Sequence, residues 1–145
     1  MTELRLDGAV RLPDGAWVRG RGLRNPMPDG PLPEFGLYLG SRRLQARHAI
    51  DWPHEWIDWP DFLLPRDTRR AVEAIQKLHQ RALDGQRVEV ACGGGVGRTG
   101  TVIASLAVLA GVPAGDAISW ARAYYHQRAV ETPWQRRWIS ATLGR

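Results

Sequence analysis

The first third of the chain alternates short apolar runs with turn-forming residues, a pattern typical of strands joined by tight turns. Residues 9–12 and 16–18 lie on either side of an Asp-Gly pair, which predicts a β-hairpin. Four prolines fall within residues 25–34 and predict a loop. The apolar run at residues 35–39 predicts a short strand, so we expect residues 1–50 to be extended and rich in loops.

From residue 67 onward, apolar side chains recur every three or four positions, which predicts helices. Asp67 is expected to cap the first helix and Gly85 to end it. Arg87–Ala91 alternates like a strand, and Thr99–Ala110 is apolar nearly all round, which suits a buried central helix. Two further helices are predicted, one over residues 114–129 and one that begins near Thr132.

This order of strands and helices predicts one α/β domain over residues 1–145, since the length is that of a single domain. We expect a short, largely parallel central sheet flanked by helices, with the N-terminal hairpin at an edge. No apolar run reaches the ~20 residues that a membrane span requires. Residues 1–8 also lack the apolar stretch of a secretory signal, so we expect a cytoplasmic protein without a membrane partner.

The chain has a net charge of +5 and is rich in arginine. Lys77 is the one lysine among its twenty basic residues. Such an excess suits a phosphorylated, nucleic-acid or anionic partner. The arginines are scattered and do not alternate with aromatic residues that could stack on bases, so a nucleic-acid partner is disfavoured. The sequence leaves the oligomeric state open.

Cys92 is the one cysteine of the chain, which excludes an intrachain disulfide framework and a cysteine-based zinc site. No pair of histidines has the spacing of metal ligands. We therefore expect neither a metal ion nor another cofactor.

A glycine-rich loop joins the strand that ends near Cys92 to the helix that starts near Thr99. Such a loop exposes backbone N–H groups opposite a helix N-terminus and predicts an anion site. A Walker loop would need glycine at position 92 and lysine at position 98, where the chain has Cys92 and Arg98. The dinucleotide fingerprint matches over residues 95–100, but no strand with an acidic end follows it.

A third interpretation uses the cysteine and the arginine, which bracket five residues and are followed by Thr99. Amide donors and a helix N-terminus lower the pKa of a thiol, and activated cysteines titrate at ~3.5–7.5. The planar guanidinium of Arg98 matches two phosphate oxygens at once. A thiolate below such a guanidinium is suited to attack a bound phosphoryl group.

This Cys-x5-Arg-Thr sequence resembles the signature of the cysteine-dependent protein-tyrosine and dual-specificity phosphatase superfamily. Trp59-Pro60-Asp61 resembles the acid loop of that superfamily and lies 31 positions before Cys92, a spacing typical of compact, bacterial-type members. Val130–Gln135 resembles the segment that places a glutamine near the attacking water, and Leu37–Gly40 is similar to the start of many dual-specificity domains. The resemblance implies a protein-tyrosine-phosphatase-like fold, with an acid loop over residues 51–67 and the strand, phosphate loop and central helix over residues 87–110.

The resemblance also implies a role for each site residue. Cys92 would be the nucleophile that forms a phosphocysteine, and Asp61 would act as acid and then as base. Thr99 would stabilise the departing thiolate, and Gln135 would orient the water. The phosphoryl oxygens would be held by the backbone of Gly93, Gly94, Gly95, Val96, Gly97 and Arg98, together with the Arg98 side chain.

Several of these positions have other interpretations. Asp58 or Asp67 could replace Asp61 as the acid, and Asp61 could be a turn residue. Gln135 could belong to a capping box by reaching back to the Thr132 amide. The chain also carries Ala91 where the superfamily usually has a histidine, which could weaken activation of the thiol.

The expected activity is hydrolysis of phosphate monoesters, with phosphotyrosine, or phosphoserine and phosphothreonine, in proteins as substrates. A non-protein ester or an RNA 5′-phosphate could be hydrolysed by the same mechanism. The loop carries no lysine, which disfavours inositol lipids. An inactive phosphate-binding module is the alternative outside enzymes.

Overall fold

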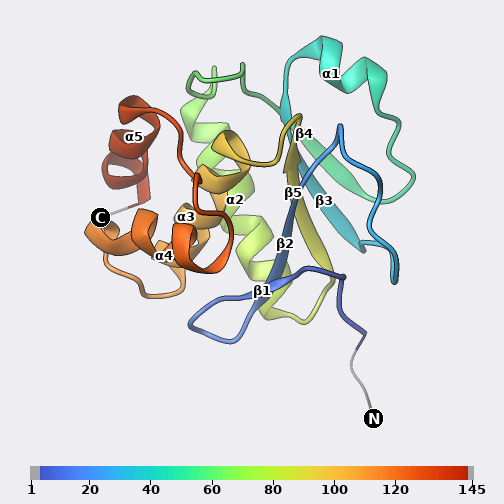
Figure 1. Cartoon of the computed structure of the whole chain (residues 1–145), viewed down its shortest axis with the longest axis horizontal. Helices are drawn as coiled ribbons and strands as arrows, with labels where there is room; N and C mark the ends of the chain where they lie inside the picture. The colour runs from blue at the N-terminus through green and yellow to red at the C-terminus, as the bar shows by residue number, and fades with distance from the viewer. Residues whose placement is uncertain (1–3, 144–145) are drawn as a thin grey trace.

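The computed structural model describes residues 4–143 of the chain, and Figure 1 shows one sheet with helices around it. The strands of the described part are β1 (Val10–Arg11), β2 (Trp17–Gly22), β3 (Phe35–Gly40), β4 (His54–Asp58) and β5 (Val88–Cys92). The helices are α1 (Arg42–Arg47), α2 (Thr68–Leu83), α3 (Gly97–Leu109), α4 (Ala117–Tyr124) and α5 (Pro133–Leu143), with a 3₁₀ turn at Ala114–Asp116. None of the helices in this part is long and apolar enough to cross a bilayer.

The strand order in the sheet is β1-β2-β5-β3-β4. In the described part of the chain, only the pairing of β1 with β2 is antiparallel; β2, β5, β3 and β4 run parallel to one another. Because β5 lies between β2 and β3, the loop that follows Cys92 leaves the carboxyl edge of the sheet at its middle. This is the position where open α/β sheets bind ligands.

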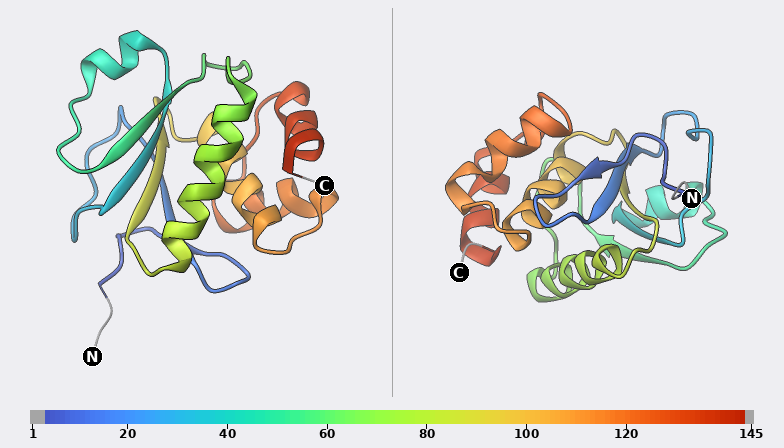
Figure 2. Two further views of the ribbon diagram at one scale, coloured as in Figure 1. Left: turned by 180° about the vertical axis from the view of Figure 1, so that it is seen from behind. Right: turned by 90° about the horizontal axis from the view of Figure 1, so that it is seen from below.

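The two faces of the sheet are buried differently. Val88 and Val90 of β5 point into the main apolar core, which also contains the buried sides of α2 and α3. Ala91 points to the opposite face, where a second cluster also contains Leu23, Tyr38 and Leu44. Figure 2 shows α2 running across the sheet, while α3, α4 and α5 gather together and α1 lies apart from them.

The predicted fold class is confirmed, as is the hairpin formed by β1 and β2. Asp67 caps α2, because its carboxylate accepts a hydrogen bond from the backbone N–H of Arg70 at 3.1 Å. Gly85 follows this helix with a positive φ of 87°, which glycine adopts without a steric cost. The helix predicted at residue 99 begins at Gly97, and its residues 97–107 are all buried, as expected of a central helix.

Three elements differ from the expectation. β4 lies inside residues 51–67, which were expected to form a loop. It is a strand because it pairs with β3, and it was missed because its side chains do not alternate regularly. α1 is one short helix that the sequence did not reveal. The helix predicted over 114–129 ends at Tyr124, because the chain turns there and carries Tyr125 toward the glycine-rich loop.

A buried carboxylate connects three strands on the second face of the sheet. Glu89 of β5 lies opposite Arg19 of β2 and accepts two hydrogen bonds from its guanidinium, at 3.0 and 2.7 Å. Arg21 donates two more, at 2.8 and 3.1 Å, and the hydroxyl of Tyr38 on β3 donates one at 2.6 Å. Trp52 donates in turn to this hydroxyl at 2.7 Å, so the polar groups at the centre of the face are paired.

Burial of Glu89 tends to raise its pKa, but the hydrogen bonds from Arg21, Tyr38 and Arg19 outweigh this and hold the pKa below its usual value. Burial, together with the Glu89 charge, raises the pKa of Tyr38 far above its usual value, so its hydroxyl stays a donor. A charged Glu89 is therefore the state that holds β2, β5 and β3 together.

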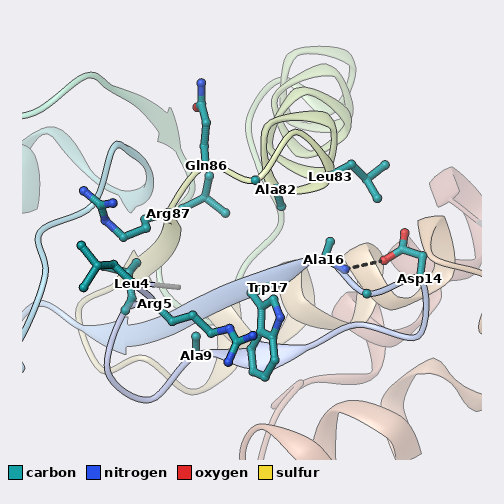
Figure 3. Close-up of a pocket in the computed structure, with 14 residues that line it drawn as sticks. Leu4, Arg5, Ala9, Asp14, Ala16, Trp17, Ala82, Leu83, Gln86 and Arg87 are labelled. Carbon is teal, nitrogen blue, oxygen red and sulfur yellow. Dashed lines mark hydrogen bonds between the residues drawn. The ribbon is translucent and has the colours of Figure 1, made fainter. Parts of the chain in front are cut away.

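A cavity of ≈ 580 Å³ lies at the amino ends of β2 and β5, away from the loop that follows Cys92. Figure 3 shows its lining, in which Arg5 lies over the ring of Trp17 with its guanidinium carbon 4.1 Å from the ring centroid. None of the predicted site residues lines this cavity.

Glu89→Gln is expected to lower the free energy of unfolding by about 3 kcal/mol, because it leaves two guanidinium groups at a buried site without a counter-charge. Urea denaturation at pH 7 measures the change. Glu73→Gln is the matched control, since Glu73 pairs with Arg69 at 3.3 Å on the surface of α2. This control should change the free energy by no more than about 0.5 kcal/mol.

The difference in the free energy of unfolding between the wild type and Glu89→Gln should also depend on pH. The pKa of Glu89 is lowered in the folded state, so its contribution is complete above the unfolded value of about 4.3 and is lost as the pH falls further. The gap should therefore narrow below about pH 4. A gap of constant size down to pH 3 would contradict the role given to the charge.

Candidate active site

The predicted nucleophile lies at the base of a tight loop, residues 93–98, which we call the glycine loop. Cys92 is the last residue of β5 and is 2% exposed. The backbone N–H of Gly95 points back at its sulfur, with 3.2 Å between N and Sγ. The sulfur therefore lies against a backbone N–H of the loop that follows it.

The turn of the glycine loop requires glycine at position 95. Gly95 has a φ of 76°, and a Cβ built on it would lie 2.5 Å from the backbone nitrogen of Gly22. The end of β2 therefore packs directly on the loop. Beyond β2, the backbone N–H of Leu23 donates to the carbonyl of Cys92 at 2.8 Å, and Arg24 donates likewise to Gly93 at 3.1 Å.

Arg98 turns its buried guanidinium toward the acid loop. Its Nη1 donates to the carbonyl oxygens of Trp59, at 2.9 Å, and Leu39, at 3.4 Å. Its Nε and the hydroxyl of Thr99 are buried and have no hydrogen-bond partner within the described residues. Unpaired buried polar groups are costly in a folded protein, so groups left in this state beside the glycine loop favour a polar ligand.

Among the three candidate acids, Asp61 is the one that the fold brings to the glycine loop. Its Oδ1 lies 3.4 Å from Nη2 of Arg98, and its side chain is 47% exposed. Asp58 pairs with Arg66 at 3.1 Å instead, and Asp67 is the cap of α2. The geometry therefore favours Asp61 over both alternatives.

Two tryptophans hold the turn that follows Asp61. The indole N–H of Trp59, which is buried in the core, donates to the carbonyl of Leu63 at 2.8 Å. The indole N–H of Trp134 donates to the carbonyl of Phe62 at 2.6 Å, and Phe62 has a φ of 60°. The left-handed conformation is rare for a bulky residue, so these contacts stabilise a strained turn beside the candidate acid.

Gln135 lies at the start of α5, with its side chain buried. Its backbone N–H donates to the hydroxyl of Thr132 at 3.2 Å, which is half of a capping box. Its side-chain oxygen accepts from the N–H of Glu131 at 3.1 Å, one residue before the expected Thr132 amide. Its side-chain nitrogen donates to the carbonyl of Leu63 at 3.3 Å, so one N–H of the amide remains for a water.

Glu131 is a neighbour of the glycine loop that the sequence did not point to. Its carboxylate lies so close to Gly97 that a Cβ on this glycine would overlap with it. The side chain of Glu131 makes no hydrogen bond or ion pair with any described residue. A carboxylate therefore faces the glycine loop at Gly97, where α3 begins.

Position 91, where the superfamily usually has a histidine, holds an alanine, and the register of the sheet explains why a small side chain fits there. Ala91 lies between Arg21 of β2 and Tyr38 of β3 in the register of the sheet. Both of these larger side chains extend across the sheet toward Glu89. Alanine at position 91 leaves them the room to do so.

Tyr125, which lies within the helix predicted over residues 114–129, is a second neighbour of the glycine loop that sequence patterns did not reveal. Its hydroxyl donates to the carbonyl of Gly95, and its ring covers Gly20, where a Cβ would lie 2.5 Å from it. Burial, followed by the charge of Cys92, raises the pKa of Tyr125 well above its usual value. Tyr125 therefore remains a donor and holds the residue whose N–H faces the sulfur.

Comparison by sequence identifies one family. The model of the family described as protein-tyrosine phosphatase matches residues 37–133, which include Asp61, Cys92 and Arg98. No curated protein matches the chain.

Comparison by structure yields similar folds. The active form of Tk-PTP superposes with a TM-score of 0.71 and 19% identity, over 95% of this chain and 97% of that one. Kinase-associated phosphatase with serine in place of its catalytic cysteine gives a TM-score of 0.69 and 13% identity, over 96% and 93% of the two chains. Likeness at such low identity concerns the fold, and it confirms the α/β architecture that was expected.

Tyr125→Phe is expected to slow alkylation of Cys92 by iodoacetamide at pH 7 by about fivefold, the equivalent of one hydrogen bond. The phenylalanine ring still covers Gly20, but the carbonyl of Gly95 loses its donor and the N–H that faces the sulfur is held less firmly. The matched control is Tyr124→Phe, because Tyr124 is 63% exposed and its hydroxyl makes no hydrogen bond with a described residue. Equal alkylation rates in the two variants would contradict the role of Tyr125.

Proposed function

The chain belongs to the protein-tyrosine phosphatase family, and from this membership we propose that it hydrolyses phosphate monoesters in proteins through a phosphocysteine intermediate. Phosphotyrosine is the substrate that we expect first, followed by phosphoserine and phosphothreonine. The proposal rests on one observation above all. The sulfur of Cys92 lies under the N–H of Gly95, in a loop whose Arg98 Nε and Thr99 hydroxyl have no partner within the described residues.

In the first step, the thiolate of Cys92 attacks the phosphorus atom, and the bond from phosphorus to the ester oxygen breaks. Backbone N–H groups of the glycine loop and the guanidinium of Arg98 stabilise the charge on the transferred oxygens. The carboxyl group of Asp61 gives its proton to the departing oxygen, which leaves as an alcohol or phenol. The product on the enzyme is a phosphocysteine.

In the second step, a water attacks the phosphocysteine and the S–P bond breaks. The carboxylate of Asp61 takes a proton from this water, so that inorganic phosphate is released and Asp61 is ready for another cycle. The N–H of Gly95 and the hydroxyl of Thr99 stabilise the departing thiolate. Gln135 would orient the water with the remaining N–H of its side-chain amide.

Exposed apolar side chains next to the candidate acid support an aromatic leaving group. Phe62 and Leu63 follow Asp61 directly and are each 52% exposed. Trp134, which bonds to the carbonyl of Phe62, is also exposed. An aryl ring of phosphotyrosine would bury part of this surface, whereas the shorter phosphoserine offers little apolar area.

The mechanism needs a reduced thiolate, and this agrees with a cytoplasmic location. Cys92 is free, and the chain contains no second cysteine with which it could form an intrachain disulfide. A reducing compartment keeps such a thiol available.

Cys92→Ser is expected to reduce hydrolysis of p-nitrophenyl phosphate by more than about 10³-fold, because a serine hydroxyl is not ionised at neutral pH. Circular dichroism and thermal unfolding check that the variant is folded. If folded wild type releases no more p-nitrophenol than Cys92→Ser, the phosphatase proposal fails. A phosphate-binding module without activity would then be the better account.

Asp61→Ala is expected to lower kcat for the same substrate by about 10²-fold, the usual contribution of a general acid, with little change in the binding of phosphate. Asp58→Ala is the matched control, because Asp58 lies on the same segment but pairs with Arg66 on the surface. Steady-state kinetics of both variants at several pH values measure the difference. Loss of kcat in Asp58→Ala instead would move the role of acid to that residue.

A further inference from the structure

An arginine from the turn that follows β2 lies over the first residue of the glycine loop. A Cβ built on Gly93 would lie 2.9 Å from Cζ of Arg24, and 3.0 and 3.1 Å from its two terminal nitrogens. The backbone N–H of Arg24 donates to the carbonyl of Gly93 at 3.1 Å. Arg24 is therefore hydrogen-bonded through its backbone to Gly93, the residue that directly follows Cys92. Its guanidinium occupies the space that a side chain at position 93 would fill.

Within residues 4–143, no carboxylate pairs with the charge of Arg24. Its side chain is exposed and forms no hydrogen bond or ion pair with any described residue. The nearby arginines differ in this respect, because Arg21 pairs with Glu89 and Arg98 lies 3.4 Å from Asp61. A solvent-exposed guanidinium beside a phosphate loop can bind an additional anion.

The opposite end of the glycine loop carries the opposite charge. The carboxylate of Glu131 lies against Gly97, whereas the guanidinium of Arg24 lies against Gly93. A substrate bound with its phosphoryl group in the loop therefore meets a positive charge on one flank and a negative charge on the other. A second anionic group on the substrate is favoured on the side of Arg24 and repelled on the side of Glu131.

We propose that Arg24 determines specificity by binding a second anionic group, a carboxylate or a phosphate, that lies a few bonds from the ester being hydrolysed. This inference rests on the proposed function, since Arg98 and the loop amides are assigned to the transferred phosphoryl group. The second anion comes either from a small ester with two anionic groups or from an acidic residue next to a phosphotyrosine. The chemistry of recognition is the same in both.

The first arm of the test uses two aryl esters that differ only in charge, 3-carboxyphenyl phosphate and 3-carbamoylphenyl phosphate. The wild type is expected to prefer the carboxylate over the amide by about fivefold in kcat/KM, the size of a well-placed exposed ion pair. Arg24→Ala should abolish this preference, and Arg24→Lys should restore part of it. Arg11→Ala, which removes the same charge from the exposed edge strand β1, should keep the preference.

Two further substrate pairs identify the source of the anion. One compares phosphotyrosine peptides with aspartate or asparagine beside the phosphorylated residue. The other compares a small bisphosphate with its monophosphate. The substrate pair with the larger Arg24-dependent preference for the second anionic group identifies where that group comes from. A preference in neither pair, or a preference that persists in Arg24→Ala, overturns the proposal.

Binding separates this proposal from the proposed catalytic mechanism. The two aryl esters are titrated into Cys92→Ser and into the double variant that also carries Arg24→Ala, with calorimetry as the readout. The carboxylate ester should bind about fivefold more tightly than the amide to the first protein and equally to the second. This result would stand even if the wild type hydrolysed nothing, whereas equal affinities in the first protein would refute the role of Arg24.

Discussion

The buried pairing of Glu89 with the arginines of β2 is the interaction on which the site depends. Glu89 lies on the central strand three positions before Cys92, and its carboxylate accepts hydrogen bonds from both β2 and β3. The end of β2 in turn packs on Gly94 and Gly95, and Arg24, just beyond this strand, donates its backbone N–H to the carbonyl of Gly93. A partner removed from this network would leave buried charge uncompensated, so the position of the glycine loop is coupled to the stability of the sheet.

The candidate site combines this base with contacts that direct single groups toward the sulfur of Cys92 and the carboxylate of Asp61. Tyr125 holds the carbonyl of Gly95, whose N–H faces Cys92. Arg98 joins the glycine loop to the acid loop through the carbonyl of Trp59 and the carboxylate of Asp61. Preorganised donors of this kind contribute to catalysis because they need no rearrangement when charge develops.

Sequence patterns predicted those elements that depend on residues close together in the chain. The Asp-Gly turn of the hairpin, the cap at Asp67 and the all-round apolar helix after the glycine loop each depend on neighbouring residues, and each was found where it was expected. β4 was missed because its strand character comes from pairing with β3 and not from alternation of its own side chains. α4 ends earlier than its periodicity suggests, because a tertiary contact of Tyr125 outweighs helix propensity.

The sequence by itself determined the chemistry that the chain can offer: one thiol, a loop of glycines before a helix, an arginine at a fixed distance from the thiol, and a nearby carboxylate. These follow from residue identity and short spacing, which the covalent chain preserves in any fold. Only the tertiary structure decided which carboxylate reaches Arg98, and that Tyr125, Glu131 and Arg24 surround the loop. Those neighbours come from separate elements, and side chains far apart in the chain meet only where the packing of strands and helices brings them together.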